Sequence, residues 1–305
     1  MPGVFPALLV QPAWSDHLLP DKPGSIRLPW GGNVVLPSSK EARAFLTRSS
    51  DQKARCLAAK RLKKSFGSTN VVDDISIQVR RGETVAILGP NGAGKTTLMS
   101  IVAGTIQPDS GEISIDGTEA TRLPVFARAR LGLSYLPQES SVFRGLSVEN
   151  NIMVALESCY PDKTTRLRLL ERILDEFGLT SVRTRNAAKL SGGMRRRCEV
   201  ARALASRPSY LMLDEPFAGV DPLAVSDLQG LISRIRDSGL GILISDHNVR
   251  ETLSIVDHAY IIVAGKVLAY GTPSEIAANE QVRQFYLGNS LDQTAGFASQ
   301  YSQNR

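Results

Sequence analysis

The sequence predicts an α/β fold in which helices cover a mainly parallel sheet and an antiparallel β part is added. Short apolar runs that end in glycine or in acidic residues have the pattern of buried strands. Segments with helical spacing alternate with these runs, and such alternation is typical of a parallel sheet. An alternating segment and a hairpin signal flank the first apolar run, which indicates the antiparallel part.

The first predicted elements surround a glycine-rich loop. Residues 71–79 alternate apolar and polar side chains, as a half-exposed strand does, and residues 84–88 form a nearly continuous apolar run, as a buried strand does. Residues 95–102 are expected to form a helix directly after the loop. Residues 113–115 followed by Asp116-Gly117 predict a hairpin.

The later elements repeat the alternation of helix and strand. A helix is expected over residues 195–205, and residues 210–213 and 241–244 are predicted as buried strands that end at polar residues. The sequence shows no internal repeat, which indicates one such unit per chain. Five apolar residues recur at helical spacing and are expected to lie in the core: Leu167, Leu170, Ile173, Leu174 and Phe177.

Composition excludes several classes of protein. A chain of 305 residues has room for one large domain or two small ones, and its net charge of +6 is no more than mildly basic. Cys56, Cys159 and Cys198 are scattered, with no CxxC pair, which argues against a disulfide scaffold or a zinc site and for a reducing compartment. No apolar run approaches the roughly 20 residues that cross a bilayer. We therefore expect a cytoplasmic protein whose membrane attachment comes through a partner.

Residues 1–55 differ from the rest of the chain. They contain seven of the sixteen prolines and both tryptophans, with no clear period of 2 or 3.6. We expect a poorly ordered extension with one short helix near residues 40–46, followed by the domain at 56–305. A wrongly assigned start site and a regulatory or docking tail are both compatible with this composition. The first ten residues contain no Lys or Arg and include two prolines, so they do not resemble a secretion signal.

A phosphate-binding loop follows the buried strand at 84–88. Its sequence is Gly89-Pro90-Asn91-Gly92-Ala93-Gly94-Lys95-Thr96, and it opens into a helix. The glycines let backbone N–H groups face the β- and γ-phosphates of a nucleotide at a helix N-terminus. Lys95 supplies a positive charge, the Thr96 hydroxyl is a ligand for Mg²⁺, and Thr97 is expected at the nucleotide too.

Two adjacent carboxylates, Asp214 and Glu215, end the apolar strand at 210–213. Carboxylates in such a place are costly unless a cation lies near. We interpret Asp214 as a ligand of Mg²⁺, directly or through water, and Glu215 as the group that acts on an attacking water. The alternative is an ordinary acidic turn before Pro216.

The segment Leu190-Ser191-Gly192-Gly193-Met194 stands before a predicted helix. A serine hydroxyl and free N–H groups at a helix start together form an anion site. Alone, the same residues would be an ordinary helix cap. Their position between the phosphate loop and Asp214-Glu215 favours the anion site.

The motifs follow one another in a fixed order: residues 89–96, Gln138, residues 190–193, residues 213–215, residues 219–221 and His247. This order resembles the nucleotide-binding domain of ABC transporters, over residues 57 to about 289. The resemblance implies a P-loop NTPase fold with an inserted helical subdomain at about 139–205 and a flexible tail after about 289. It also implies that the chain binds ATP and Mg²⁺ and hydrolyses ATP.

The resemblance assigns roles to four further residues. Phe66 stands where the family has an aromatic that stacks on adenine, and Gln138 matches the glutamine that senses Mg²⁺ and the membrane partner. Asp221 matches the aspartate that communicates across a dimer. His247 matches the switch histidine at the γ-phosphate, although a histidine after a strand could equally be a surface residue.

The family mechanism implies a homodimer in which Ser191 to Gly193 of one subunit cap the ATP held by the phosphate loop of the other. One departure is Met194, where the family has Gln or Glu. The contacts of Ser191 and the glycines do not depend on that side chain. We expect reduced polar support rather than an inactive site.

Several stretches resemble the ATP-binding subunit of lipopolysaccharide export (Lpt) systems: residues 135–144, 217–222, 245–253, 271–276 and 286–288. The resemblance implies a homodimer beneath two permease subunits at the inner membrane, with the groove for the permease coupling helix near Phe143 and Arg144. Phe143 could equally be a core aromatic.

Two alternatives stay open. The ATPase of a branched-chain amino acid or urea importer has similar C-terminal segments, but its histidine context usually differs. A soluble ABC protein that acts on ribosomes or DNA normally has paired cassettes or long coiled-coil insertions. The run Arg195-Arg196-Arg197 lies in the helix after Ser191, where solvated or interface roles are favoured over nucleic acid.

Overall fold

The computed structural model describes residues 24–27, 33–36 and 55–283. The expected helix near residues 40–46, the segment 286–288 and the tail after about 289 lie outside the described residues. Within the predicted N-terminal extension, β1 (Gly24–Arg27) and β2 (Asn33–Leu36) pair as an antiparallel hairpin. The period-based analysis of residues 1–55 missed these two strands.

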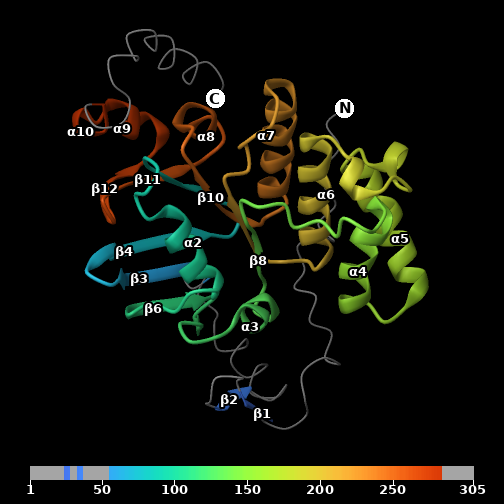
Figure 1. The fold of residues 1–305 in the computed structure, drawn as a ribbon, viewed down its shortest axis with the longest axis horizontal. Coiled ribbons are helices and arrows are strands. Elements are labelled where there is room, and N and C mark those ends of the chain that lie inside the picture. Colours follow the sequence, from blue (N-terminus) through green and yellow to red (C-terminus); the bar gives the residue numbers. More distant parts are fainter. Residues whose placement is uncertain (1–23, 28–32, 37–54, 284–305) are drawn as a thin grey trace.

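The centre of the molecule is a six-stranded sheet in the order β12-β11-β5-β10-β9-β8, and the predicted α/β fold is confirmed (Figure 1). All neighbours are parallel except the pair β11 and β12. The strands β5, β9 and β10 are buried at every residue, which explains their continuous apolar sequence. The bounds are β5 Thr84–Leu88, β8 Leu133–Leu136, β9 Tyr210–Asp214, β10 Gly241–Asp246, β11 His258–Val263 and β12 Lys266–Gly271.

A second, four-stranded antiparallel sheet has the order β4-β3-β6-β7. From Ile75 to Arg80, strand β4 buries every second residue and exposes the others, as the alternating sequence predicts, whereas Val71 to Asp74 do not alternate regularly. Asp116 and Gly117 both have positive φ in the turn between β6 and β7, which is the conformation that Asp-Gly hairpins favour. The bounds are β3 Cys56–Phe66, β4 Thr69–Arg80, β6 Ser110–Ile115 and β7 Thr118–Glu119.

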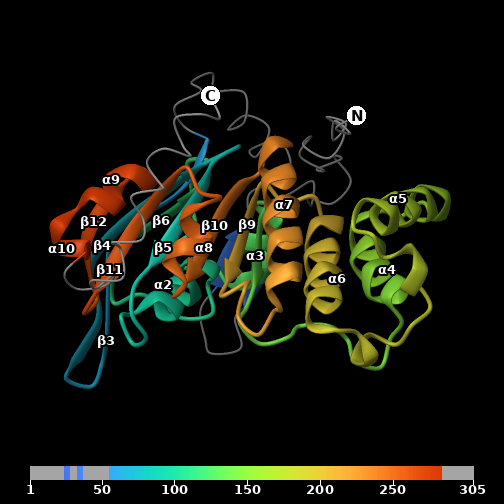
Figure 2. The same ribbon diagram turned by 90° about the horizontal axis from the view of Figure 1, so that it is seen from above.

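Five helices, α4, α5, η3, η4 and α6, lie between β8 and β9 in the chain, although these two strands are neighbours in the sheet. Figure 2 shows α4 and α5 at one end of the molecule, beyond α6 and α7, with the antiparallel strands at the other end. The bounds are α2 Lys95–Ala103, α3 Val125–Arg130, α4 Val148–Cys159, α5 Lys163–Glu176, η3 Thr180–Val182, η4 Ala187–Lys189, α6 Gly192–Ala205, α7 Pro222–Asp237, α8 Val249–Leu253, α9 Pro273–Ala278 and α10 Glu280–Val282. Among the described residues, none of these helices is long and apolar enough to span a membrane.

One of the five residues expected in the core is not there. Leu170, Ile173, Leu174 and Phe177 are buried, but Leu167 is 45% exposed. Leu167 stands in the early part of α5, at the edge of its apolar stripe, and Leu169 is buried instead.

The phosphate-loop helix α2 is held at its far end by a buried arginine. The guanidinium of Arg128, on α3, donates to the carbonyl oxygens of Ile101 and Val102 at 2.6 Å, in the last turn of α2. It also donates to Leu123 O at 2.9 Å and to Thr121 O at 2.8 Å. Burial lowers the pKa of Arg128 to about 10. A cation at the carboxyl end of a helix stabilises the helix dipole and satisfies carbonyl groups that have no partner in the helix.

We predict that Arg128→Met lowers the free energy of unfolding by about 2–4 kcal/mol, because buried carbonyl groups lose their donors. The matched control is Arg130→Met on the same helix. Arg130 has its guanidinium 5.7 Å from the ring of Phe126, which is 46% exposed, so its loss is expected to cost no more than about 0.5 kcal/mol. Denaturant unfolding measures both values. Equal losses in the two variants would contradict the role of Arg128.

Candidate active site

Neighbouring strands of the parallel sheet bring the predicted site residues to one edge. In the register of the sheet, Asp246 pairs with Leu88, the last residue of β5, and Ser245 pairs with Asp214. The last residue of β8 pairs with Leu213, next to Asp214. The phosphate loop, Glu215, His247 and Gln138 therefore all follow the carboxyl ends of adjacent strands, where α/β folds place their ligands.

The phosphate loop is closely packed against the rest of the chain. Gly94 caps α2 with φ 102°, a left-handed conformation that favours glycine. A β-carbon at this position would lie 2.3 Å from the carbonyl oxygen of Val71, so only glycine fits. The turn between β11 and β12 also holds the phosphate loop, since Gly265 N donates to Ala93 O at 3.1 Å. Asn91, Gly92 and Thr96 remain exposed, while Thr97 is half-buried.

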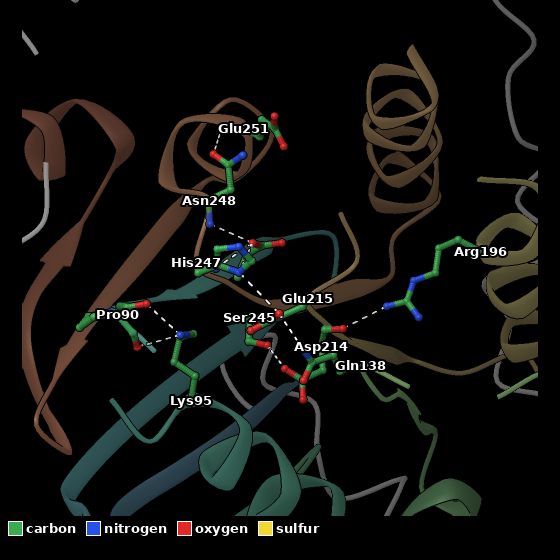
Figure 3. Close-up of polar contacts among 12 residues, drawn as sticks. Pro90, Lys95, Gln138, Arg196, Asp214, Glu215, Ser245, His247, Asn248 and Glu251 are labelled. Atoms are coloured by element: carbon green, nitrogen blue, oxygen red, sulfur yellow. Dashed lines mark hydrogen bonds and ion pairs between the residues drawn. The ribbon is translucent and has the colours of Figure 1, made fainter. Parts of the chain in front are cut away.

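Lys95 is the buried cation of the site, with 5% of its surface exposed. Its Nζ donates to Gly89 O at 2.8 Å and to Pro90 O at 3.0 Å, as Figure 3 shows. Burial lowers the pKa of Lys95, and the carboxylates of Glu215, Asp246 and Asp214 oppose this shift. The ammonium therefore interacts electrostatically with three carboxylates and donates to the carbonyls of the loop that is predicted to bind phosphates.

Asp214 is 1% exposed and accepts hydrogen bonds on both carboxylate oxygens. Ser245 Oγ donates to Oδ1, and the hydroxyl of Tyr135 donates to Oδ2 at 3.2 Å. Burial raises the pKa of Tyr135, and the charge of Asp214 adds to this, so the hydroxyl keeps its proton and stays a donor. Asp214 was predicted from the sequence, but Ser245 and Tyr135, which fix its orientation, were not.

Glu215 meets two of the other three predicted catalytic side chains, Gln138 and His247. Gln138 Nε2 donates to Glu215 Oε2 at 2.8 Å, and His247 Nδ1 lies 3.5 Å from the same oxygen (Figure 3). Glu215 has φ 44°, which is uncommon for a residue with a side chain, and its N–H donates to Ser245 O at 2.8 Å. A neighbouring strand thus holds the strained backbone that directs the carboxylate toward Gln138 and His247.

Asp246 holds the turn that carries His247. Its Oδ1 accepts from the N–H groups of His247 at 2.7 Å and Asn248 at 2.9 Å. The side chain is 1% exposed, and its Oδ2 is buried without a hydrogen-bond partner. Burial raises the pKa of Asp246, and the two backbone N–H groups partly offset this shift. In the sequence Asp246 is only context for His247, because its role depends on backbone N–H groups that the sequence does not show.

Ser191 and Asp221 are both helix caps. Ser191 Oγ accepts from Met194 N at 3.4 Å, so α6 begins at Gly192, three residues before the predicted start at 195. Asp221 Oδ1 accepts from Ala224 N at 3.0 Å and caps α7.

In both ribbon views α6 and α2 are separated by α7 and by strands of the sheet (Figures 1 and 2). Within one chain, Ser191 to Gly193 therefore belong to a different part of the molecule from the phosphate loop.

The two exposed aromatic residues singled out in the sequence lie far apart in the chain. Phe66, at the end of β3, is 50% exposed, and Lys64 Nζ lies 5.5 Å from its ring centre. Phe143 is 48% exposed, with the guanidinium of Arg202 5.0 Å from its ring centre. Arg144 is exposed beside it. Phe143 is therefore a surface residue, and the alternative of a core aromatic is wrong.

Arg196 and Glu199 join α6 to the end of β9 and to the segment that follows β8. Neither residue was predicted from the sequence. Arg196 donates to Asp214 O at 3.1 Å, to Pro137 O at 3.2 Å and to Glu199 Oε2 at 3.1 Å. Glu199 also accepts from Ser140 Oγ and Ser141 N, both at 2.8 Å. Because Arg196 is 7% exposed, the expected solvated role of the arginine run is wrong for this residue. The signal was present: Arg196 and Glu199 share a helical face with buried Val200.

Comparison with known proteins agrees with this geometry. A family model described as ABC transporter matches residues 72–218. A probable ABC transporter ATP-binding protein of Azorhizobium caulinodans is 54% identical over 77% of this chain and 84% of the relative. The lipopolysaccharide export system ATP-binding protein LptB of Escherichia coli is 49% identical over 77% of this chain and 98% of that protein.

Solved structures of ATP-binding cassettes have the same fold. The ADP conformation of an ATP-binding cassette of an ABC transporter superposes with a TM-score of 0.68 at 26% identity, over 76% of this chain and 98% of that one. The cbiO1 protein of Clostridium perfringens, part of the transporter complex cbiONQ, gives 0.68 at 26% identity, over 75% and 92%. The resemblance found in the sequence is confirmed: the chain belongs to the ABC transporter ATP-binding proteins and is an ATP-hydrolysing cassette of that family.

Proposed function

We propose that this chain powers the extraction of lipopolysaccharide from the inner membrane, as a homodimer bound to two integral-membrane permease subunits on the cytoplasmic face. The observation that carries the proposal is the likeness to LptB, which extends over 98% of that protein at 49% identity. The relatives of higher identity have names that specify no cargo. The residues around His247, Asp246 to Leu253, are the stretch that best separates this reading from an amino-acid importer.

The surface at Phe143 and Arg144 supports a docked permease. The backbone of Phe143 is held on both sides by Asn151, whose Oδ1 accepts from Phe143 N at 2.8 Å and whose Nδ2 donates to Phe143 O at 3.1 Å. Arg202 donates to Ser141 O at 2.7 Å and lies against the Phe143 ring. An exposed aromatic with a fixed backbone is an anchor that loses little entropy when a partner binds.

Hydrolysis needs a positioned water, a proton acceptor and positive charge at the phosphates. Lys95 and the N–H groups at the start of α2 supply the positive charge when ATP replaces the loop carbonyls as partner of the ammonium. Glu215 is the proton acceptor, because its carboxylate is held by Gln138 Nε2 and faces His247. Asp246 keeps His247 in place for the γ-phosphate through the backbone turn.

Three oxygen donors fit Mg²⁺ at this edge of the sheet: the Thr96 hydroxyl, the amide oxygen of Gln138 and the carboxylate of Asp214. Mg²⁺ binds proteins through one or two carboxylates together with phosphates and waters, and this set has one buried carboxylate beside the phosphate loop. When bound, the ion spreads the charge of the phosphates.

The separation of Ser191 from the phosphate loop supports a dimer. A hydroxyl and free N–H groups at the start of the 14-residue helix α6 suit the phosphates of an ATP held by a second copy. Phe66 suits the adenine ring of the ATP bound by its own chain. Hydrolysis would then remove the bridge between the copies, and the opening would be passed to the permeases through the segment at Phe143.

We predict that Glu215→Gln binds ATP with near-normal affinity but hydrolyses it ~10²–10³ times more slowly, since the amide cannot accept the proton of the attacking water. Phosphate release measures turnover, and a fluorescent nucleotide measures affinity. The variant is also expected to accumulate as an ATP-bound dimer in size-exclusion chromatography. Near-normal turnover in this variant would contradict the role of Glu215 as the proton acceptor.

The cargo is tested by purifying the tagged chain from membranes and identifying the permeases that accompany it. A lipopolysaccharide-type permease pair is expected, and Phe143→Ser is expected to lower its recovery at least ~10-fold through loss of an aromatic anchor. The matched control is Leu167→Ser on α5, because Leu167 is 45% exposed, much like Phe143 at 48%. Recovery of amino-acid permeases instead would contradict the assignment of lipopolysaccharide as the cargo. Equal losses in the two variants would contradict the proposal that the permease docks at Phe143.

A further inference from the structure

The start of α6 lies against the start of α7 in the same chain. A β-carbon at Gly192 would lie 3.4 Å from Gly219 O, which is an ordinary contact. A β-carbon at Gly193 would lie 2.8 Å from the β-carbon of Ala224, closer than real β-carbons approach one another. Glycine at 193 is therefore required by packing within the chain, independently of any contact with ATP.

Ala224 touches both motifs that face the nucleotide interface. Its β-carbon is the group that Gly193 approaches, and its N–H donates to Asp221 Oδ1 at 3.0 Å. Gly193 and Asp221 therefore both contact one residue in the first turn of α7.

The surroundings leave this junction little freedom to adjust. Arg197 on α6 donates to Asp227 on α7 at 2.5 Å. Met194 and Val220, one from each motif, both pack against the same core. Farther along α7, Val225 and Leu228 are buried in that core. Because both helices are anchored, a new atom between Gly193 and Ala224 has to displace the start of α6 itself.

We propose that Gly193 is a positioning residue: because it has no side chain, the start of α6 closes onto Ala224, and this close packing sets where Ser191 to Gly193 stand relative to Asp221. This rests on the proposed dimer, in which those residues cap the ATP of the second copy. Met194 supports the same junction by packing. Where the family has a polar residue, this chain has a side chain that packs half-buried against the core beneath the junction.

The test is a rescue experiment with Gly193→Ala, Ala224→Gly and the two together. In Gly193→Ala the two β-carbons must separate from 2.8 Å to at least an ordinary 3.4 Å, a shift of 0.6 Å. Displacements of about 1 Å can cost ~10²-fold in rate, so a 10- to 100-fold fall in kcat is expected. ATP affinity of the isolated chain is expected to stay unchanged, because the phosphate loop is not moved.

Ala224→Gly keeps the N–H that holds Asp221 and is expected to turn over within about twofold of the natural chain. The double variant is expected to recover to within about threefold, because removing one β-carbon makes room for the other. A double variant as slow as Gly193→Ala would overturn the proposal and leave Gly193 as a nucleotide contact alone.

The matched control is Gly192→Ala, whose β-carbon has ordinary room and does not face Ala224. Any loss that it causes is expected to persist when Ala224→Gly is added, and rescue there would also overturn the proposal. Thermal unfolding of every variant separates displacement from misfolding. ATPase activity of the purified chain is the readout, so failure of the lipopolysaccharide assignment would leave the outcome unaffected.

Discussion

The site is organised by an excess of negative charge at one edge of the parallel sheet. Asp214, Glu215 and Asp246 all act electrostatically on the buried ammonium of Lys95. Two of these carboxylates are almost fully buried, and such groups are costly without partners. The chain satisfies Asp214 with Ser245 and Tyr135, and satisfies one oxygen of Asp246 with two backbone N–H groups. The remaining negative charge fits the proposed Mg²⁺ site and the proposed turn of Lys95 toward phosphates.

The rest of the fold holds this edge in place. Arg128 fixes the carboxyl end of the helix whose amino end carries the phosphate loop. Arg196 links α6 to the backbone of Asp214, and Glu199 links the same helix to the segment that leads to Phe143. Under the proposed function, a movement of α6 would act both on this edge of the sheet and on the surface proposed for the permease.

Local sequence was sufficient for much of the fold and the site. Residues 84–96 combine a buried strand, a glycine turn and a helix start, and each of these depends on neighbours in sequence. Asp214-Glu215 and His247 were identifiable because each follows an apolar strand. Arg196, Glu199 and Asp246 were missed because their roles depend on partners distant in sequence or on backbone groups that any residue has. Leu167 was misplaced because helical spacing defines a stripe but not which of its edges is covered.

The account is tested most directly by mixing two inactive forms of the chain. Lys95→Met removes the ammonium of the phosphate loop, and Ser191→Arg blocks the start of α6, so each form retains the half of the site that the other lacks. A dimer with one chain of each kind has one complete site, and the account predicts that ATP hydrolysis returns on mixing. A mixture that forms mixed dimers by cross-linking yet stays as inactive as its components would contradict the account.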